Sequence, residues 1–144
     1  MRFEHEVVID QPPEEVFRYL TEPDNLPAWQ KTVVETRKEE SDRPLALGSR
    51  FTEVRTFLGR RIESQLEVTE LDPNHIFSLR VISGPVLARV RHVLEPSGAG
   101  TRLSVTTDGD AGGLAKLGGP LVARQARKQG EADFANLKRT LERG

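Results

Sequence analysis

The chain has 144 residues, of which 36% are hydrophobic and 30% charged, and this length and composition are typical of a single domain with one core. A formal net charge of −1 gives no electrostatic reason to expect nucleic acid or an anionic membrane as a partner, and the lack of cysteine excludes disulfides, thiol nucleophiles and cysteine-ligated zinc. No apolar run approaches the ~20 residues that cross a bilayer, and the amino terminus lacks a signal-peptide core, so we expect one cytoplasmic domain over residues 1–144 without integral membrane association.

The first elements alternate between strand and helix signals. Residues 3–9 place apolar and charged side chains in turn, which predicts a half-buried strand. Asp10 and the following QPPEE predict an N-cap and first turn for a short helix, because a capping side chain, prolines and acids all favour a helix start. The proline-rich segment 22–29 predicts a brief helical turn that delivers Trp29 to the next strand. The short helix should bury Val16, Phe17 and Leu20.

The middle of the chain reads as successive strands separated by turn signals. The segment 109–119 looks like a flexible linker, and this linker and the turn at 83–85 are either gates over a ligand site or ordinary surface turns. With the strand at 3–9 there are seven strands in total, the others being 31–39, 48–57, 60–71, 76–82, 86–95 and 101–109.

Residues 118–141 predict a long amphipathic helix whose inner face is small at first and large near its end. Gly130 within it costs about 1 kcal/mol relative to alanine, so either a neighbour approaches closely there or space is left open. An antiparallel sheet needs one face covered, and this helix is the one long element left to cover it, which favours a cavity beneath its small half. The inner face comprises Gly119, Ala123, Ala126, Gly130, Phe134, Leu137 and Leu141.

The hairpin at Leu58-Gly59 fixes which strand residues face inward. A two-residue loop pairs Phe57 with Arg60, and it therefore pairs Phe51 with Leu66, Glu53 with Ser64, and Arg55 with Ile62. The apolar pairs mark the core face, so Glu53 and Arg55 point the same way. Buried charge is costly unless it is paired or hydrated, so these two side chains pair with each other, reach solvent at a cavity mouth, or contact a ligand.

Other candidate side chains share this inner surface. His92 should face inward from its strand, where a histidine with a pKa near neutrality can donate or accept a proton, or simply be a satisfied polar residue. Trp29 either stacks on a planar ligand or seals the core. Gln129 and Asp133 lie at the edge of the inner helix face, where they supply polar contacts or remain solvated.

Several chemistries are not indicated. His5, His75 and His92 are scattered without metal-ligand spacing, and no nucleophile elbow, P-loop or dinucleotide fingerprint is present. We therefore expect neither a metal nor a cofactor, and hydrolase, kinase and dehydrogenase activities are disfavoured.

Particular stretches carry a resemblance over essentially the whole chain. They are the opening strand followed by IDQPPEEVFRYLTEPDNLPAW, Gly48 with Phe51, EVTELDPNHIFSLRV, GTRLSV and the terminal amphipathic helix. Together they resemble the polyketide cyclase/dehydrase branch of the START and Bet v 1-like (SRPBCC) superfamily. The resemblance implies an α+β helix-grip fold: a seven-stranded antiparallel sheet curved around a long carboxy-terminal helix, with two short helices after strand one. It also implies a deep cavity for apolar or amphipathic molecules, but it does not identify the ligand.

Three hypotheses for function follow, with a monomer or homodimer expected in each. The first is binding of a small hydrophobic or aromatic molecule. The second is a cyclase/dehydrase-type enzyme, in which Arg55 polarises a carbonyl and His92 or Glu53 moves a proton. The third is an adaptor that docks a protein or a lipid-like tail. The candidate ligand-binding residues are Trp29, Phe51, Glu53, Arg55, Phe57, Ser64, Leu66, Phe77, Leu79, Val90, His92, Thr107, Ala123, Ala126 and Gly130.

Overall fold

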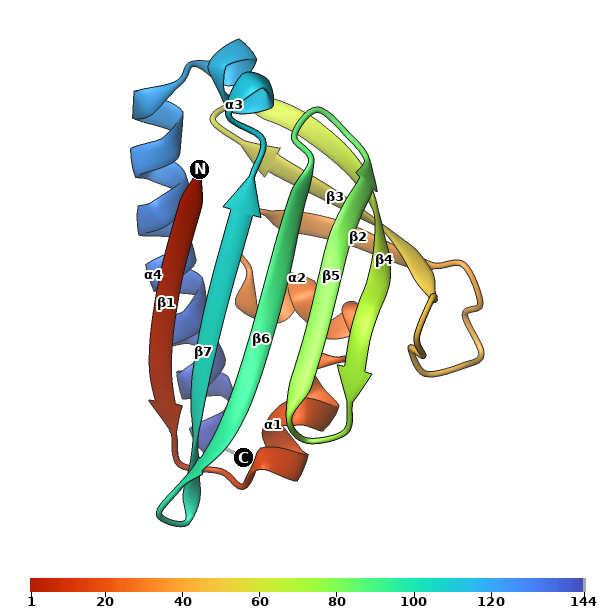
Figure 1. Ribbon diagram of the computed structural model, residues 1–144, viewed down its shortest axis with the longest axis vertical. Coiled ribbons are helices and arrows are strands. Elements are labelled where there is room, and N and C mark those ends of the chain that lie inside the picture. The colour runs from red at the N-terminus through yellow and green to blue at the C-terminus, as the bar shows by residue number, and fades with distance from the viewer. Residues whose placement is uncertain (144) are drawn as a thin grey trace.

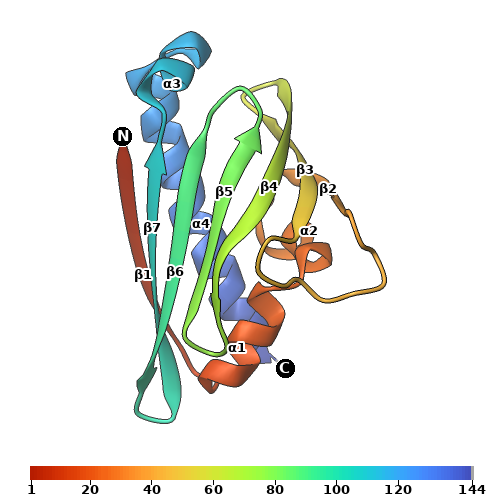
Figure 2. The ribbon, with the colours of Figure 1, turned by 45° about the vertical axis from the view of Figure 1, so that its right-hand side comes forward.

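The computed structural model describes residues 1–143, so Gly144, the last residue of the predicted single domain, lies outside the described residues. Seven antiparallel strands form one sheet in the order β1-β7-β6-β5-β4-β3-β2, and a long helix crosses one face of it (Figures 1 and 2). The predicted seven-stranded sheet with helices after its first and last strands is confirmed. The strands are β1 (Arg2–Ile9), β2 (Val33–Lys38), β3 (Arg50–Phe57), β4 (Arg60–Asp72), β5 (Ile76–Ser83), β6 (Ala88–Ser97) and β7 (Gly100–Gly109).

The helical elements fall into two groups. Three short ones follow β1, namely α1 (Pro13–Leu20), the 3-10 turn η1 (Pro23–Asn25) and α2 (Leu26–Trp29). Two follow β7, namely α3 (Ala111–Leu117) and α4 (Pro120–Arg143). Figure 1 shows α1 at one end of the sheet and α3 at the other, with α4 running between these ends. Among the described residues, no helix is long and apolar enough to cross a membrane.

The predicted hairpin register is confirmed. Phe57 pairs with Arg60, Glu53 with Ser64, and Phe51 with Leu66. Both loop residues have a positive φ, 51° at Leu58 and 76° at Gly59, as the tight turns that match strand twist require. The assignment of alternate β3 residues to the inner face, which was inferred from this one turn, therefore holds along the whole strand.

The expected N-cap of the first helix is wrong. Pro12, not Asp10, occupies the N-cap position, and no side chain caps the helix start. Two successive prolines, Pro12 and Pro13, restrict φ to values that suit the first turn, so the chain starts the helix without a side-chain acceptor. The backbone N–H of Asp10 instead donates to Glu142 Oε2 at 2.8 Å, which ties the end of β1 to the end of α4.

The segment predicted as a flexible linker contains a helix. Asp110 Oδ1 accepts a hydrogen bond of 3.0 Å from the Gly112 backbone N–H, an arrangement that stabilises a helix start. A Cβ at Gly113 would lie 2.6 Å from the Pro85 carbonyl oxygen, so glycine is needed for α3 to approach the β5–β6 turn. The two segments considered as gates are thus packed against each other.

The long helix packs on one edge of the sheet and leaves the middle open. α4 contacts β1 along its length and α2 beside it. The core fills the end of the molecule where α1, α2 and the last turns of α4 converge, around Trp29 and Leu137. Its most deeply buried apolar side chains are Ile9, Val16, Trp29, Val68, Leu94, Leu103 and Leu137.

Candidate functional site

A cavity of about 320 Å³ lies between the sheet and α4. Its walls come from β1 and β3 to β7 on one side and from α1, η1, α2 and α4 on the other, and most of the lining side chains are apolar. A site of this size lies at the small end of the range for organic ligands.

The structure brings the predicted ligand-binding residues together around this cavity, with one exception. The lining includes Trp29, Phe51, Glu53, Arg55, Phe57, Ser64, Leu66, Phe77, Leu79, Val90, His92, Thr107, Ala126 and Gly130. The strand residues among them are those that side-chain alternation assigned to the inner face, while their role in binding stays a prediction.

The exception is Ala123, which does not line the cavity. Its place is taken by Val122, whose side chain is 6% exposed. The inner face of α4 is therefore rotated relative to the predicted stripe and includes Gln129 and Asp133 as well as Ala126. Asp133, a polar residue that the helical wheel placed at the border of this face, is buried in the structure.

Arg55 is the centre of a polar cluster on the cavity wall. Its Nη2 donates to Glu53 Oε1 at 2.7 Å and to Gln30 Oε1 at 2.8 Å, and its Nη1 donates to Thr32 Oγ1 at 3.1 Å. The Glu53 side chain is 12% exposed and the Arg55 side chain 27%, so the pair is partly buried. Of the alternatives for these two charges, mutual pairing on the inner face is the one observed.

Asp133 is buried, at 4% exposure, beside this cluster. Its Oδ1 accepts hydrogen bonds from the backbone N–H of Lys31 at 3.3 Å and from Gln129 Nε2 at 2.9 Å. Burial raises the pKa of the Asp133 carboxyl, and the two hydrogen bonds and the charges of Arg55 and Lys31 oppose that rise. The carboxyl is thus held in place on one oxygen within a mostly apolar cavity.

His92 does not have the near-neutral pKa that proton transfer required. Its Nδ1 lies 2.8 Å from the Phe77 carbonyl oxygen and its ring stacks on the Phe77 ring at a centroid distance of 5.4 Å. A carbonyl only accepts, so Nδ1 carries the proton and donates it, which leaves Nε2 as an acceptor. Burial lowers the pKa of His92 to about 4, which favours the neutral ring at pH 7.

His5 is a cavity residue that was not among the predicted site residues. The ring lies against Phe134 at a centroid distance of 5.4 Å, and a Cβ on Gly130 would lie 2.6 Å from His5 Nε2. The pKa of His5 is lowered, and burial is the largest cause of the shift. Gly130 is therefore small because the imidazole of β1 approaches it, while Ala126 is the small helix residue that borders the open space. The strand alternation that turned His5 inward was the signal that pointed to this residue.

Trp29 forms the back wall of the cavity. It is 1% exposed, and its ring lies 5.4 Å from the Phe134 ring. Within residues 1–143, its Nε1 is the one fully buried side-chain nitrogen or oxygen without a hydrogen-bond partner. The residue therefore seals the core and lines the cavity at once.

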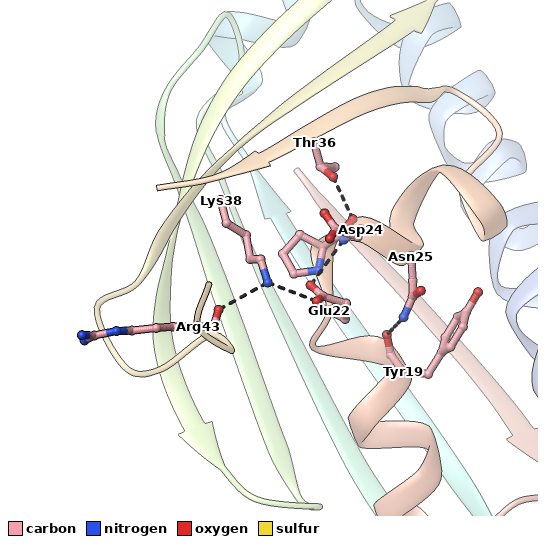
Figure 3. Close-up of polar contacts among 8 residues, drawn as sticks. Tyr19, Glu22, Asp24, Asn25, Thr36, Lys38 and Arg43 are labelled. Atoms are coloured by element: carbon pink, nitrogen blue, oxygen red, sulfur yellow. Dashed lines mark hydrogen bonds and ion pairs between the residues drawn. The ribbon is translucent and has the colours of Figure 1, made fainter. Parts of the chain in front are cut away.

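The β2–β3 connection is fastened to η1 next to the cavity. The ammonium of Lys38, on a side chain only 8% exposed, lies 3.1 Å from Glu22 Oε1 and 3.3 Å from the Arg43 carbonyl oxygen (Figure 3). Thr36 Oγ1 donates to the Pro23 carbonyl oxygen at 3.0 Å on the same side. Pro23 and Leu45 line the cavity, so these polar contacts fix two of its apolar wall segments.

No group of three or more histidine, aspartate or glutamate side chains is arranged to hold a metal ion within the part of the chain that the structure describes. The polar groups of the cavity are instead an arginine, two carboxyls, two histidines and amide or hydroxyl side chains. Such a set can orient an organic molecule through hydrogen bonds.

The fold and the cavity define a helix-grip protein with an internal ligand-sized space. The model of the family described as polyketide cyclase/dehydrase and lipid transport matches residues 1–142, and the chain belongs to this family. None of the curated protein sequences compared with this chain matches it significantly.

Solved structures share the fold at low sequence identity. TTHA0849 from Thermus thermophilus superposes with a TM-score of 0.80 at 21% identity, over 98% of this chain and 97% of that one. Ara h 8.0201 gives 0.76 at 12% identity, over 100% and 99% of the two chains. The di-domain ARO/CYC BexL from the BE-7585A biosynthetic pathway gives 0.73 at 24% identity, and the match covers 99% of this chain but 46% of BexL. These similarities confirm the helix-grip architecture.

Proposed function

We propose that the protein binds one small hydrophobic or aromatic molecule in the cavity between its sheet and α4. The observation that carries the proposal is a space of about 320 Å³ lined by apolar side chains with a few fixed polar groups. The family to which the chain belongs, which includes lipid transport in its description, supports the same function.

Catalysis is less well supported by the site than binding. The cyclase/dehydrase hypothesis needs His92 or Glu53 to move a proton. His92 is neutral and already donates to a backbone carbonyl, and Glu53 is paired with Arg55 at 2.7 Å. Arg55 retains N–H groups beyond the three bonds it makes, and these suit the orientation of a ligand oxygen.

The first test is native mass spectrometry of freshly purified protein, followed by extraction with organic solvent. We expect an adduct of one small molecule per chain, released on denaturation and apolar or aromatic in character. Occupation should disappear in Ala126→Phe, because a phenyl group at position 126 would fill the space. Ala132→Phe, on the exposed side of the same helix, is the matched control and should keep the adduct.

A second measurement tests binding even if the natural ligand is lost during purification. Trp29 is the one tryptophan of the chain and stands in the cavity wall, so its fluorescence reports occupation directly. Titration with N-phenyl-1-naphthylamine should quench it with a stoichiometry of one in the wild type and in Ala132→Phe, but not in Ala126→Phe. Equal quenching in all three proteins would place the probe elsewhere and refute the proposal.

A further inference from the structure

One oxygen of Asp133 is left for the ligand. Oδ1 takes both available protein donors, the Lys31 backbone N–H and Gln129 Nε2. No donor among the described residues reaches Oδ2. That oxygen is also not sealed off, because within residues 1–143 Trp29 Nε1 is the one fully buried side-chain atom without a partner. Asp133 is one of the residues that line the cavity, so the cavity is the space in which Oδ2 can meet a ligand group.

The titratable and charged groups around Asp133 come from three segments, the first of which is β1 with His5. Arg55 and Glu53 lie on β3, and Lys31 lies between α2 and β2. The Arg55 guanidinium already pairs with Glu53 at 2.7 Å and serves Gln30 and Thr32, so its charge is compensated before a ligand arrives. Lys31 is exposed and is bound to Asp133 through its backbone N–H rather than its ammonium. An incoming anion therefore meets a guanidinium that already has its counter-charge and a carboxyl whose Oδ2 has no hydrogen-bond donor.

A hydroxyl group suits this carboxyl in either protonation state. It donates to an ionised carboxylate, and it accepts from a protonated carboxyl, which burial favours. A ligand carboxylate can only accept, so it can bond to Oδ2 only when Asp133 is protonated. The hydroxyl ligand should therefore bind more tightly than the carboxylate ligand, because an unpaired or like-charged polar group in an enclosed site costs binding free energy.

We propose that Asp133 makes the cavity select uncharged ligands that carry a hydroxyl group, alcohols or phenols, over the corresponding carboxylates. Asp133 is thus a specificity-determining residue, and the ligand lies with its polar end between Asp133 and Arg55 and its apolar body toward Phe51, Leu66 and Phe77. This inference rests on the proposed binding function and narrows it to a ligand class.

The test uses four naphthalenes of the same shape that differ in one substituent. They are 2-methylnaphthalene, naphthalene-2-methanol, naphthalene-2-carboxylate and naphthalene-2-methylammonium, titrated at pH 7 against Trp29 fluorescence. We expect the alcohol to bind at least as well as the methyl compound and about tenfold more tightly than the carboxylate. Equal affinity of alcohol and carboxylate, or tightest binding of the ammonium compound, would overturn the proposal.

Variants connect the selectivity to the residue. Asp133→Asn keeps an oxygen for Lys31 and Gln129 but presents an amide N–H₂ to the cavity, so the preference for alcohol over carboxylate should fall about tenfold. Glu131→Gln removes the same charge from an exposed position of α4 outside the cavity and should leave the preference unchanged. A similar loss of preference in both variants would assign the effect to overall charge and overturn the proposal.

A calorimetric measurement on the wild type keeps the proposal testable if Asp133→Asn does not fold. Binding of the carboxylate should take up a proton, seen as a dependence of the binding enthalpy on the ionisation enthalpy of the buffer, and binding of the alcohol should not. Carboxylate binding without proton uptake would contradict the proposal. If none of the four compounds binds, the proposed binding function fails together with the selectivity, whereas equal binding of all four compounds would refute the selectivity alone.

Discussion

The imidazole of His5 lies directly over Gly130, so that a Cβ on the glycine would come within 2.6 Å of His5 Nε2 and 3.0 Å of His5 Cε1. These residues lie on the first strand and the last helix, and the approach holds α4 against the edge of the sheet. The imidazole is itself fixed by Phe134.

The close approach predicts the effect of Gly130→Ala. Alanine favours a helix interior over glycine by about 1 kcal/mol, but the added methyl group must displace the packed imidazole, and overpacking costs about 1 to 3 kcal/mol. We expect the free energy of unfolding in urea to fall by about 1 kcal/mol. In a His5→Ala background the same substitution should raise it, because the clash is gone. A stabilising effect in both backgrounds would show that the imidazole moves aside freely.

The buried His92 predicts a specific loss of stability in mild acid. Its pKa is about 4 in the folded protein and about 6.5 in the unfolded chain, so between these values the unfolded state binds more protons. The contribution of the neutral ring is complete above pH 6.5 and is lost as the pH falls toward 4, at a cost of roughly 3 kcal/mol.

The measurement is the free energy of unfolding at pH 7 and at pH 4.5 for the wild type and His92→Gln. The variant should be less stable at pH 7 but should lose less stability on acidification. Titration of Asp133 and His5 is common to both proteins and cancels in the comparison. Parallel pH profiles would mean that His92 is accessible to protons in the folded state.

Arg55 and Glu53 should contribute unequally to stability. Arg55→Ala leaves a carboxylate that is 12% exposed without its counter-charge, and leaves Gln30 and Thr32 without a donor. We expect a loss of about 2 kcal/mol, less than for a fully buried pair because Arg55 is partly solvated. Glu53→Gln retains an acceptor for the guanidinium and should cost about 1 kcal/mol or less. Thermal unfolding of the two variants checks this order, and equal losses would contradict it.

The β3–β4 turn offers a stabilising substitution at a residue that does not line the cavity. Leu58 has a φ of 51° and is 58% exposed, a conformation and exposure that suit asparagine better than leucine. We expect Leu58→Asn to raise the free energy of unfolding by about 0.5 to 1 kcal/mol. Leu58→Val is the matched control and should lower it, because a β-branched residue tolerates positive φ least.

The sheet and most of the cavity wall could be predicted because they depend on local rules. A two-residue turn fixes the register of β3 and β4, and side-chain alternation then assigns Phe51, Glu53 and Arg55 to one face. The true N-cap position, Pro12, could not be predicted in this way, since the proline pair at 12–13 starts the helix without a side-chain acceptor.

The inner face of α4 escaped prediction because it depends on contacts between distant segments. A helical wheel ranks faces by hydrophobicity, and it therefore preferred Ala123 to Asp133. Burial of Asp133 depends on a backbone donor at Lys31, more than a hundred positions earlier in the chain. The pKa of His92 likewise depends on how deeply β6 is buried and on the carbonyl of Phe77. Neither can be predicted from the alternation of side chains along β6.

The order of the sheet has a consequence for how the protein is made. β1 pairs with β7, and α4, with 24 residues, follows all seven strands, so the cavity gains its second wall only after the whole sheet has been synthesised. On the ribosome the strands β2 to β6 can pair as hairpins, but β1 stays unpaired until β7 has been synthesised. The apolar faces of β1 and of the hairpins remain uncovered until then. Chains released before residue 120 would expose the ligand-binding surface to solvent and to one another, so a ligand meets a finished site only after α4 has left the ribosome.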